Sequence, residues 1–398
     1  MTLPDKARVI TVLHYYATGP GQELHEWLAA QHAQESVLLE HPFPFSRRRA
    51  AVCTRRFSNG GTLCSHYPRR VRWAPLRYLL DVLRTLRIAL CLPGTYDLYV
   101  GNGCLDTLPG LLLRRVGKVR RVVLYTIDYA PDAYGRIFGR IYRWLDRYCC
   151  YRSDALWNLT RERMTVARER DGLNLARSAP RVWVPHGTHA RACITRMPST
   201  PDQYRVAFFG HVKEGSGVQL LLSALPRLRS RFPRLTLDII GDGEYLPTLQ
   251  RMAVQHGVND AVRFHGFIEE HTRAEELLME CGVGVALYGR GAGDYSFCGD
   301  PGKPKVYLAC GLPVIISDVP EVAGLIAERR AGVAVPYDAT ALEAALATIQ
   351  SEHAVFRANA LALARDFEWS HVFARAWRET TEQLVSLRGT CARQENVV

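Results

Sequence analysis

Short apolar runs alternate with helical patterns of apolar residues along the whole chain. In the first half these runs are typical of buried parallel strands, and each ends in glycine or polar residues. They cover residues 9–13, 96–100, 122–127, 154–159 and 181–184. Parallel strands bring their carboxyl ends to one edge of a sheet, so we expect the residues after each run to line one crevice.

The second half has a more regular alternation. Its apolar runs and the helical patterns between them cover residues 206–209, 218–232, 235–240, 245–256, 262–265, 273–281, 283–287, 306–310 and 314–317. Strands separated by helices of this length predict a doubly wound parallel sheet. The sequence therefore predicts an α/β fold with two Rossmann-like doubly wound domains.

A linker and the C-terminal pattern set the expected domain ranges. Residues 198–203 contain Pro, Ser and Thr, which favours a boundary there. We expect an N-terminal domain over residues 1–198, a second domain over residues 199–366 and closing helices over residues 367–398.

Arginines accompany two helical patterns in the first half. Residues 76–92 place leucines on one face, with Arg77, Arg84 and Arg87 along its flank. Residues 135–148 carry a second set, which a helix would gather into one cationic stripe. This set is Arg136, Arg140, Arg143 and Arg147. Each pattern fits either a core helix with a solvated edge or an interfacial helix on anionic lipid.

The net charge of +12 comes from the first half of the chain. Residues 1–196 contain 31 Lys and Arg against 15 Asp and Glu, whereas residues 197–398 contain 20 against 24. A basic half suits anionic partners. We rank an anionic membrane surface above nucleic acid, because the sequence shows no recognised nucleic-acid-binding module. The arginine-rich residues 42–73 predict an irregular connection.

The eleven cysteines show no CxxC pair and no regular spacing. This pattern favours reduced thiols in a cytoplasmic protein and argues against a disulfide framework and a zinc site. The N-terminus lacks the apolar run of a secretory signal, and no stretch is long enough to span a membrane. We expect a cytoplasmic chain, peripheral on the membrane at most, with no metal or other cofactor.

Residues 294–318 predict an anion site. They form a polar loop, a short helix and an apolar strand, so that backbone N–H groups and two ammonium groups meet at a helix N-terminus. Phosphate is the anion that such a loop favours. The loop residues concerned are Asp300, Pro301, Gly302, Lys303 and Lys305.

Further candidates lie at strand ends of the first half. Gly19 and Gly21 follow the first apolar run and form either a plain turn or a ligand contact. Asp128 is either an acid–base or substrate-orienting group or a helix cap. His186 is expected to be structural.

Five segments of the second half resemble the donor-binding domain of the retaining GT-B glycosyltransferases, the family 4-like glycosyl transferases group 1. They lie between about residues 205 and 337 and read FFGHVKEGSGVQLLLSAL, LDIIGDGEYLPTLQ, VRFHGFIEE, DPGKPKVYLACGLPVIISDVPEVAGLI and AGVAVPYD. The first half resembles the acceptor domain loosely, and residues 367–387 look like the helices that cross back to it. The resemblance implies two domains facing a cleft and metal-independent, retaining transfer of a sugar from a nucleotide-diphosphate sugar.

The chain lacks two cations of the family's donor site. After its first strand the family has Gly-Arg and then Lys-Gly, where this chain has Gly210-His211 and Ser216-Gly217. We therefore assign diphosphate binding and a catalytic role to Lys303, because a diphosphate leaving group needs positive or N–H contacts. The other residues that the resemblance places at the donor are His211, Lys213, Gly241, Gly243, Glu244, Asp300, Pro301, Gly302 and Lys305.

The family's paired glutamates are also missing, since Cys298 and Val306 occupy their positions. On the acceptor side the resemblance gives Asp128 an orienting role and places Gly19 and Gly21 in a substrate loop. The expected acceptor is lipid-linked or a glycan, in polysaccharide or glycolipid assembly. Two alternatives stay open: a sugar-nucleotide epimerase of the same architecture, and a binding or scaffold protein descended from a transferase.

Overall fold

The computed structural model describes residues 4–15, 19–43, 50–68, 73–196, 201–289 and 298–395, and beyond residue 386 it describes the backbone alone. The chain divides into two compact units. Unit 1 comprises Met1–Pro185 and Val372–Val398, and unit 2 comprises His186–His371. The division precedes the linker that we expected at 198–203, because the short helix α6 (Ala190–Ile194) packs on helices of unit 2.

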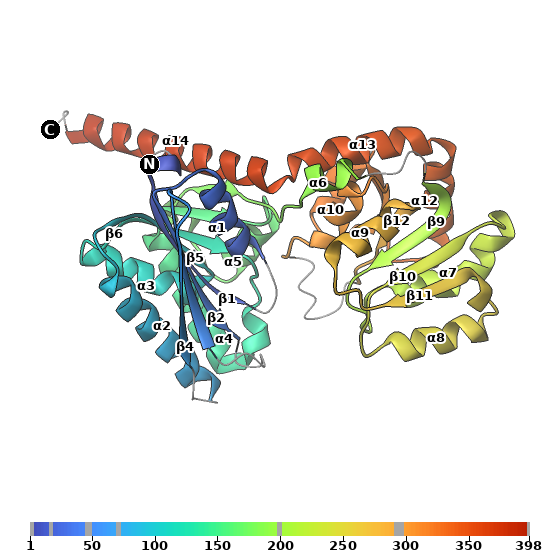
Figure 1. Ribbon diagram of the computed structural model, residues 1–398, viewed down its shortest axis with the longest axis horizontal. Coiled ribbons are helices and arrows are strands. Elements are labelled where there is room, and N and C mark those ends of the chain that lie inside the picture. Colours follow the sequence, from blue (N-terminus) through green and yellow to red (C-terminus); the bar gives the residue numbers. More distant parts are fainter. Residues whose placement is uncertain are drawn as a thin grey trace. The chain divides into compact units, whose positions relative to one another are not determined.

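Unit 1 contains an eight-stranded sheet in the order β4-β3-β2-β1-β5-β6-β7-β8 (Figure 1). Neighbours from β2 to β8 are parallel, and β3 is antiparallel to both β2 and β4. The strands are β1 (Arg8–Tyr15), β2 (Glu35–Pro42), β3 (Ala50–Phe57), β4 (Thr62–Pro68), β5 (Tyr96–Asn102), β6 (Val119–Thr126), β7 (Ala155–Asn158) and β8 (Arg181–Trp183).

The β3–β4 hairpin corrects the prediction of an irregular connection over residues 42–73. Its turn contains Asn59 and Gly60, and Gly60 has a φ of +83°. Phe57 N–H donates to Gly61 C=O at 3.0 Å and closes the hairpin. An Asn-Gly pair between alternating strands is a strong hairpin signal that the arginine content obscured. Residues 44–49 and 69–72 lie outside the described ranges.

The helices of unit 1 cover its sheet. α3 contacts both α2 and α4, so these three helices pack beside one another. Apolar residues of these helices and of the strands form one buried core. The helices are α1 (Pro20–Ala30), α2 (Ala74–Cys91), α3 (Cys104–Arg115), α4 (Gly135–Arg152), α5 (Arg163–Arg170) and, from Val372 on, α14 (Trp369–Glu395).

The C-terminal helix α14 is anchored in unit 1 through aromatic residues. Trp157 Nε1 donates to Thr380 Oγ1 at 2.8 Å, and both groups are buried. The Trp27 ring lies 5.9 Å from that of Phe373 and 5.8 Å from that of Trp377. These contacts bind the C-terminal end of the chain to the N-terminal part of the sequence.

Unit 2 contains a six-stranded, fully parallel sheet in the order β11-β10-β9-β12-β13-β14. Its strands are β9 (Asp202–Phe209), β10 (Thr236–Ile240), β11 (Val262–Gly266), β12 (Cys281–Ala286), β13 (Val314–Ser317) and β14 (Gly332–Val335). The longer helices are α7 (Val218–Arg231), α8 (Leu246–Gln255), α9 (His271–Met279), α10 (Gly302–Ala309), α11 (Val322–Glu328), α12 (Ala339–Ser351) and α13 (His353–Asp366). The predicted α/β class with two doubly wound domains is confirmed.

The strand order of unit 2 reverses between β9 and β12. From β9 the chain moves outward through β10 to β11, and then returns to β12 on the other side of β9 before moving to β13 and β14. In open parallel sheets, ligands bind beyond the carboxyl ends of the strands at this switch point. The topology thus marks the ends of β9 and β12 as the place to look for a site.

Candidate functional site

The ends of β9 and β12 are joined by a buried tyrosine of α10. Tyr307 Oη accepts from the Phe209 N–H at 2.7 Å and donates to the Val285 carbonyl at 3.1 Å. Its ring lies against Gly284, where a Cβ would approach Tyr307 Cγ to 2.5 Å. Tyr307 therefore fixes α10 on the sheet. Sequence reasoning missed this residue, because a lone tyrosine in a short helix gives no pattern.

Lys303 lies one helical turn before Tyr307 and on the same face of α10. Its stem passes over Gly210, where a Cβ would come within 2.5 Å of Lys303 Cε. The ammonium nitrogen lies 4.4 Å from the centroid of the Phe208 ring. Burial, and secondarily the charge of Lys213, lower the pKa of Lys303 to about 8. Within the described ranges no carboxylate pairs with Lys303.

An unpaired, partly desolvated ammonium group is costly unless an anion approaches it. Lys303 sits at the start of an eight-residue helix, where backbone N–H groups also favour negative charge. Lys213, exposed on the loop after β9, is a second cation without a carboxylate partner among the described residues. The switch point of unit 2 is thus positively charged and suited to a phosphate.

Asp300 and Lys305, by contrast, are paired inside the fold. Lys305 is fully buried, and its Nζ forms an ion pair with Asp300 Oδ1 and donates to the Pro301 carbonyl at 3.2 Å. Burial lowers the pKa of Lys305, which Asp300 partly opposes. We expected Lys305 to offer a free ammonium group to the donor. The structure corrects this expectation, because the buried pair instead holds the loop before α10.

His186 completes that loop. Its backbone N–H donates to Asp300 Oδ2 at 2.7 Å, and its ring lies 5.2 Å from that of Trp369. A Cβ at Gly302 would lie 3.0 Å from His186 Cε1, so the first residue of α10 has little room for a side chain. These contacts are structural, as we expected for His186.

The predicted donor glycines come together in the loops after β9 and β10. Gly210 N–H donates to Ile240 C=O at 2.9 Å, and φ is +121° at Gly210 and +144° at Gly241. A Cβ at Gly241 would overlap the Gly210 oxygen, and one at Gly243 would overlap the Val212 oxygen. Close packing of the two loops is sufficient to explain these glycines.

The remaining predicted donor residues lie on the same loops. His211 Nε2 lies 3.0 Å from Glu244 Oε2, and both side chains are exposed. Ser216, just before α7, is buried, and its Oγ has no hydrogen-bond partner among the described residues. In the family that the sequence resembles, a lysine is expected at this position. A buried hydroxyl without a partner beside a helix N-terminus adds a second polar group to this edge.

The acceptor-side candidates belong to unit 1. Asp128 follows β6 and is exposed, its carbonyl accepts from Tyr142 Oη at 3.3 Å, and desolvation by nearby protein atoms raises the pKa of its carboxyl. Gly19 is the N-cap residue of α1, and its backbone N–H donates to Gln22 Oε1 at 3.0 Å. A Cβ at Gly21 would overlap Asn102 Nδ2, so Gly21 allows α1 to approach the end of β5.

The arginines of α4 do not form the single cationic stripe that we expected. Arg143 binds Asp132 and, at 3.1 Å, Asp171, and Arg147 Nη1 donates to the Asp171 carbonyl at 2.6 Å. Arg136 and Arg140 are exposed. Beside them lie four exposed apolar residues, which are Ile137, Phe138, Ile141 and Trp144. The exposed face of α4 is therefore apolar with two adjacent cations.

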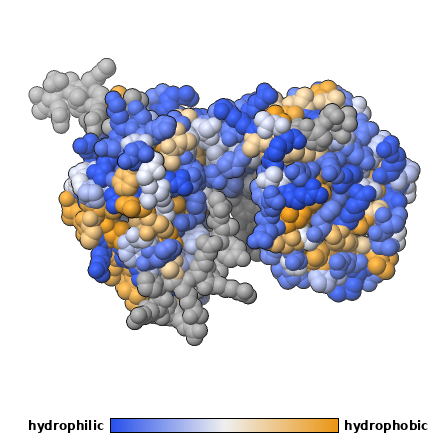
Figure 2. Space-filling view, in the orientation of Figure 1, coloured by the Kyte–Doolittle hydropathy of each residue, from blue (hydrophilic) through white to orange (hydrophobic). Residues whose placement is uncertain are grey.

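The flank of α2 also differs from the prediction. Arg77 is buried, and burial lowers its pKa, so it is not a surface cation. Arg84 Nη1 lies 3.2 Å from the buried Asp81 carboxylate, whereas Arg87 is exposed. Several leucines of α2 are exposed, namely Leu76, Leu79, Leu83 and Leu90. In Figure 2, hydrophobic residues gather on the side of unit 1 where Figure 1 places α2 and α3.

The described residues contain neither a metal-binding cluster nor a membrane-spanning helix. They contain no group of three or more His, Cys, Asp or Glu side chains arranged to hold a metal ion. In the same ranges no helix combines the length and the apolar character needed to cross a bilayer.

Residues 203–352 match the family model described as "Glycosyl transferases group 1". The chain is 30% identical over 254 residues to a GDP-mannose-dependent alpha-(1-6)-phosphatidylinositol monomannoside mannosyltransferase of Mycolicibacterium smegmatis, covering 61% of this chain and 56% of the relative. It is 29% identical over 182 residues to a glycogen synthase of Mycobacterium tuberculosis, covering 44% and 42%. The chain thus spans about half the length of these relatives.

Solved structures extend the likeness to nearly the whole chain. Sucrose-phosphate synthase from Thermosynechococcus elongatus has a TM-score of 0.68 at 16% identity and covers 96% of this chain, which covers 100% of it. HepE of Anabaena, solved with UDP and glucose, has a TM-score of 0.64 at 13% identity, with coverages of 94% and 100%. At such identities the likeness establishes the fold, which is GT-B.

Proposed function

We propose that this chain, which belongs over residues 203–352 to the glycosyl transferases group 1 and has the GT-B fold, transfers a sugar from a nucleotide-diphosphate sugar to an acceptor hydroxyl. The observation that carries the proposal is the position of Lys303. Its ammonium group lies at the switch point of a parallel sheet, above a glycine and without a carboxylate partner in the described part of the chain. This is where a diphosphate would be bound.

During sugar transfer, negative charge develops on the departing diphosphate. Preorganised positive groups and hydrogen-bond donors stabilise such charge in the transition state, and removing one donor of an oxyanion hole typically costs about 2.7–4 kcal/mol. In this chain Lys303, Lys213 and the first N–H groups of α10 supply the positive potential. A donor held in this way requires no metal ion, and we propose retention at the anomeric carbon, as the family resemblance implies.

The names of the relatives indicate which donor nucleotides to test. The Mycolicibacterium smegmatis relative is named as GDP-mannose-dependent, and HepE was solved with UDP and glucose. We therefore propose to test UDP-, GDP- and CDP-sugars as donors. For each donor, the thermal shift of the protein, the hydrolysis of the donor and the transfer of the sugar to membrane extracts are measured. One donor class should raise the melting temperature and turn over, and the anomeric configuration of the product, read by NMR, should equal that of the donor.

The same measurements separate the rival functions. Cys298 and Val306 replace the family's paired glutamates, which favours a binding protein descended from a transferase as the second candidate. A thermal shift with one nucleotide sugar but no turnover in the presence of membranes would support that candidate. Formation of an isomeric nucleotide sugar would support an epimerase instead.

For the acceptor we propose a lipid-linked molecule or a glycan on an anionic membrane surface. The name of the relative includes phosphatidylinositol monomannoside, a lipid acceptor. Exposed apolar residues with adjacent cations on α4 and α2 suit a helix surface that lies at a bilayer interface. Flotation with anionic and with neutral vesicles tests this part: we expect recovery with the anionic vesicles, and absence from both would contradict it.

A further inference from the structure

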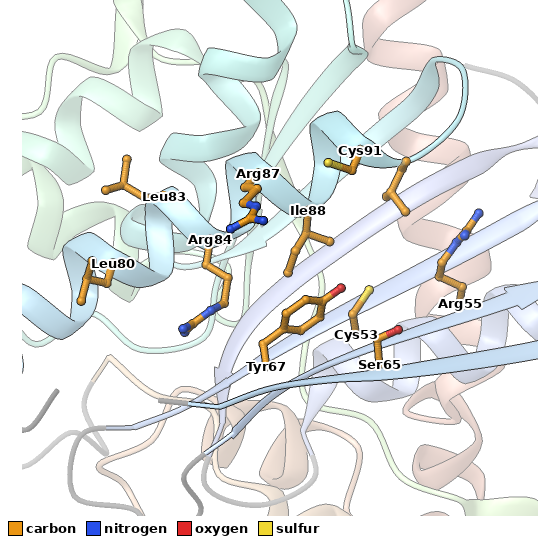
Figure 3. A pocket seen from close by; sticks show the side chains of 11 residues that line it. Cys53, Arg55, Ser65, Tyr67, Leu80, Leu83, Arg84, Arg87, Ile88 and Cys91 are labelled. Atoms are coloured by element: carbon orange, nitrogen blue, oxygen red, sulfur yellow. The ribbon is translucent and has the colours of Figure 1, made fainter. Parts of the chain in front are cut away.

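A pocket of about 560 Å³ lies in unit 1 between α2 and the β3–β4 hairpin (Figure 3). Its volume falls within the roughly 300–1,000 Å³ of small-molecule pockets. Figure 3 shows side chains of α2 facing those of the two strands. The lining includes Arg55 and Ser65 of the hairpin, Leu83, Arg84 and Arg87 of α2, and Leu92 directly after α2.

The lining of the pocket is mostly apolar but includes three arginines. Most lining residues are aliphatic, aromatic or cysteine, and no carboxylate is among them. Arg55 is neutralised by Glu35, with Nη2 at 2.6 Å from Oε1, and Arg84 is bound to Asp81. Arg87 is exposed and has no ion-pair partner within the described ranges. An occupant must therefore be largely apolar and carry negative charge near Arg87.

One end of the pocket lies away from the edge of the sheet where sugar transfer is expected. Arg55 is paired with Val37, near the start of β2, and Leu92 directly follows α2 and precedes β5. The pocket thus extends toward the amino ends of the parallel strands. Ligands of doubly wound sheets that take part in chemistry bind beyond the carboxyl ends. The end of the pocket that Arg55 and Leu92 line therefore lies away from that edge.

The pocket also opens onto the apolar surface of α2. Leu83 lines it and is at the same time 51% exposed. Leu79 and Leu90 continue the exposed apolar surface along the helix, 54% exposed each. A helix surface that meets acyl chains would bring such chains directly to the mouth of the pocket.

We propose that the pocket binds one alkyl chain of an anionic membrane phospholipid, with the lipid phosphate held by Arg87. The proposal rests on the membrane association put forward under the proposed function and adds a specific lipid site to it. The apolar chain fits a lining that offers few hydrogen-bonding groups, and the phosphate satisfies the unpaired guanidinium. Such a site would anchor the enzyme through a single lipid in addition to surface attraction.

Titration with monomeric lysophosphatidic acids of increasing chain length tests the proposal, with inorganic phosphate as the headgroup alone. We expect one-to-one binding that strengthens about fourfold for each added methylene until the pocket is filled. Inorganic phosphate should not bind measurably. Affinity independent of chain length, or equal binding of phosphate alone, would overturn the proposal.

Two substitutions, each with a matched control, test where the lipid binds. Ser65→Trp fills the pocket from an exposed position and should weaken binding at least about tenfold, whereas His66→Trp puts the same ring on the opposite face of β4 and should leave it unchanged. Arg87→Glu should weaken binding about tenfold through loss of a charge-assisted hydrogen bond, and Arg170→Glu on α5 should not. Wild-type affinity in Ser65→Trp, with an unchanged melting temperature, would overturn the site.

The titration contains no sugar donor. Absence of sugar transfer by the wild-type protein would therefore overturn only the proposed function, whereas absence of chain-dependent lipid binding would overturn only this site. Donor hydrolysis by Ser65→Trp should equal that of the wild type, because the substituted residue lies in unit 1 and the donor site lies in unit 2.

Discussion

The two units differ in where their positively charged side chains lie and in how far these side chains are buried. In unit 2, Lys303 is partly buried at the switch point and has no ion-pair partner among the described residues. Lys305, two residues later, is neutralised by an ion pair with Asp300. In unit 1 the cations that have no ion-pair partner among the described residues, such as Arg136 and Arg87, lie on exposed helices beside apolar residues. A desolvated, focused charge suits one small anion, whereas scattered charges beside apolar side chains suit an extended anionic surface.

Removal of the buried lysine should have the largest effect. Lys305→Ala leaves the Asp300 carboxylate buried without its ion-pair partner, so the free energy of unfolding should fall by about 3–5 kcal/mol. Lys303→Met is the matched control, because it removes a lysine two positions away that has no carboxylate partner within the described ranges. Chemical denaturation of both variants checks this. Equal destabilisation by the two substitutions would show that we have assigned their roles wrongly.

Crowding of the donor loops should have the next largest effect. Gly241→Ala forces a side chain into a φ of +144° and against the Gly210 oxygen, which should cost about 1–3 kcal/mol of stability or displace the loop. Gly257→Ala is the control: Gly257 also has a positive φ, +64°, but no atom lies within 4 Å of its Cβ position. Thermal unfolding compares the two. A larger loss in Gly257→Ala would contradict the close packing.

The pH dependence of nucleotide binding should report the state of Lys303. Since burial lowers its pKa from 10.5 to about 8, the free protein loses the charge as pH rises through about 8. Nucleoside diphosphate affinity should fall above that pH, at most about tenfold per unit. The same shift makes the charged lysine a cost to folding below pH 8, which is relieved between pH 8 and 10.5. Calorimetric titration across this range measures the profile, and a profile unchanged in Lys303→Met would assign it to another group.

The smallest effects should come from the exposed cations of unit 1. Arg136→Gln and Arg140→Gln should each weaken binding to anionic vesicles by about 1 kcal/mol. Arg143→Gln should weaken it less, because Asp132 and Asp171 already neutralise Arg143. Vesicle sedimentation at two salt concentrations measures all three. If Arg143→Gln had the largest effect, the exposed face of α4 would not be the binding surface.

Much of the fold followed from periodicity, because parallel strands are continuous apolar runs. The strand over Val314–Ser317 is observed with the predicted bounds, and α4 begins at Gly135 as predicted. The β3–β4 hairpin was missed, because strands at the edge of a sheet bear polar residues on exposed positions. Propensity alone does not distinguish such strands from an irregular segment.

The site was less accessible from sequence than the fold. The DPGKPK segment predicted an anion site, but Lys303 and Lys305 look equivalent there, and only the three-dimensional contacts show that Asp300 pairs with Lys305. Tyr307, which fixes α10 to β9 and β12, had no signal in the sequence because its role depends on two distant backbone groups. Residues 294–297, which belong to the predicted stretch, lie outside the described ranges.

The assignment of Lys303 to the donor diphosphate is tested most directly by the affinity of the free nucleotide. Calorimetry with UDP and GDP on wild type, Lys303→Ala and the exposed-surface control Arg251→Ala compares the three proteins without requiring an acceptor. We predict that the preferred nucleotide binds Lys303→Ala roughly tenfold or more weakly, as expected for loss of a charge-assisted hydrogen bond, and binds Arg251→Ala normally. Equal affinity of the wild type and Lys303→Ala would contradict the assignment.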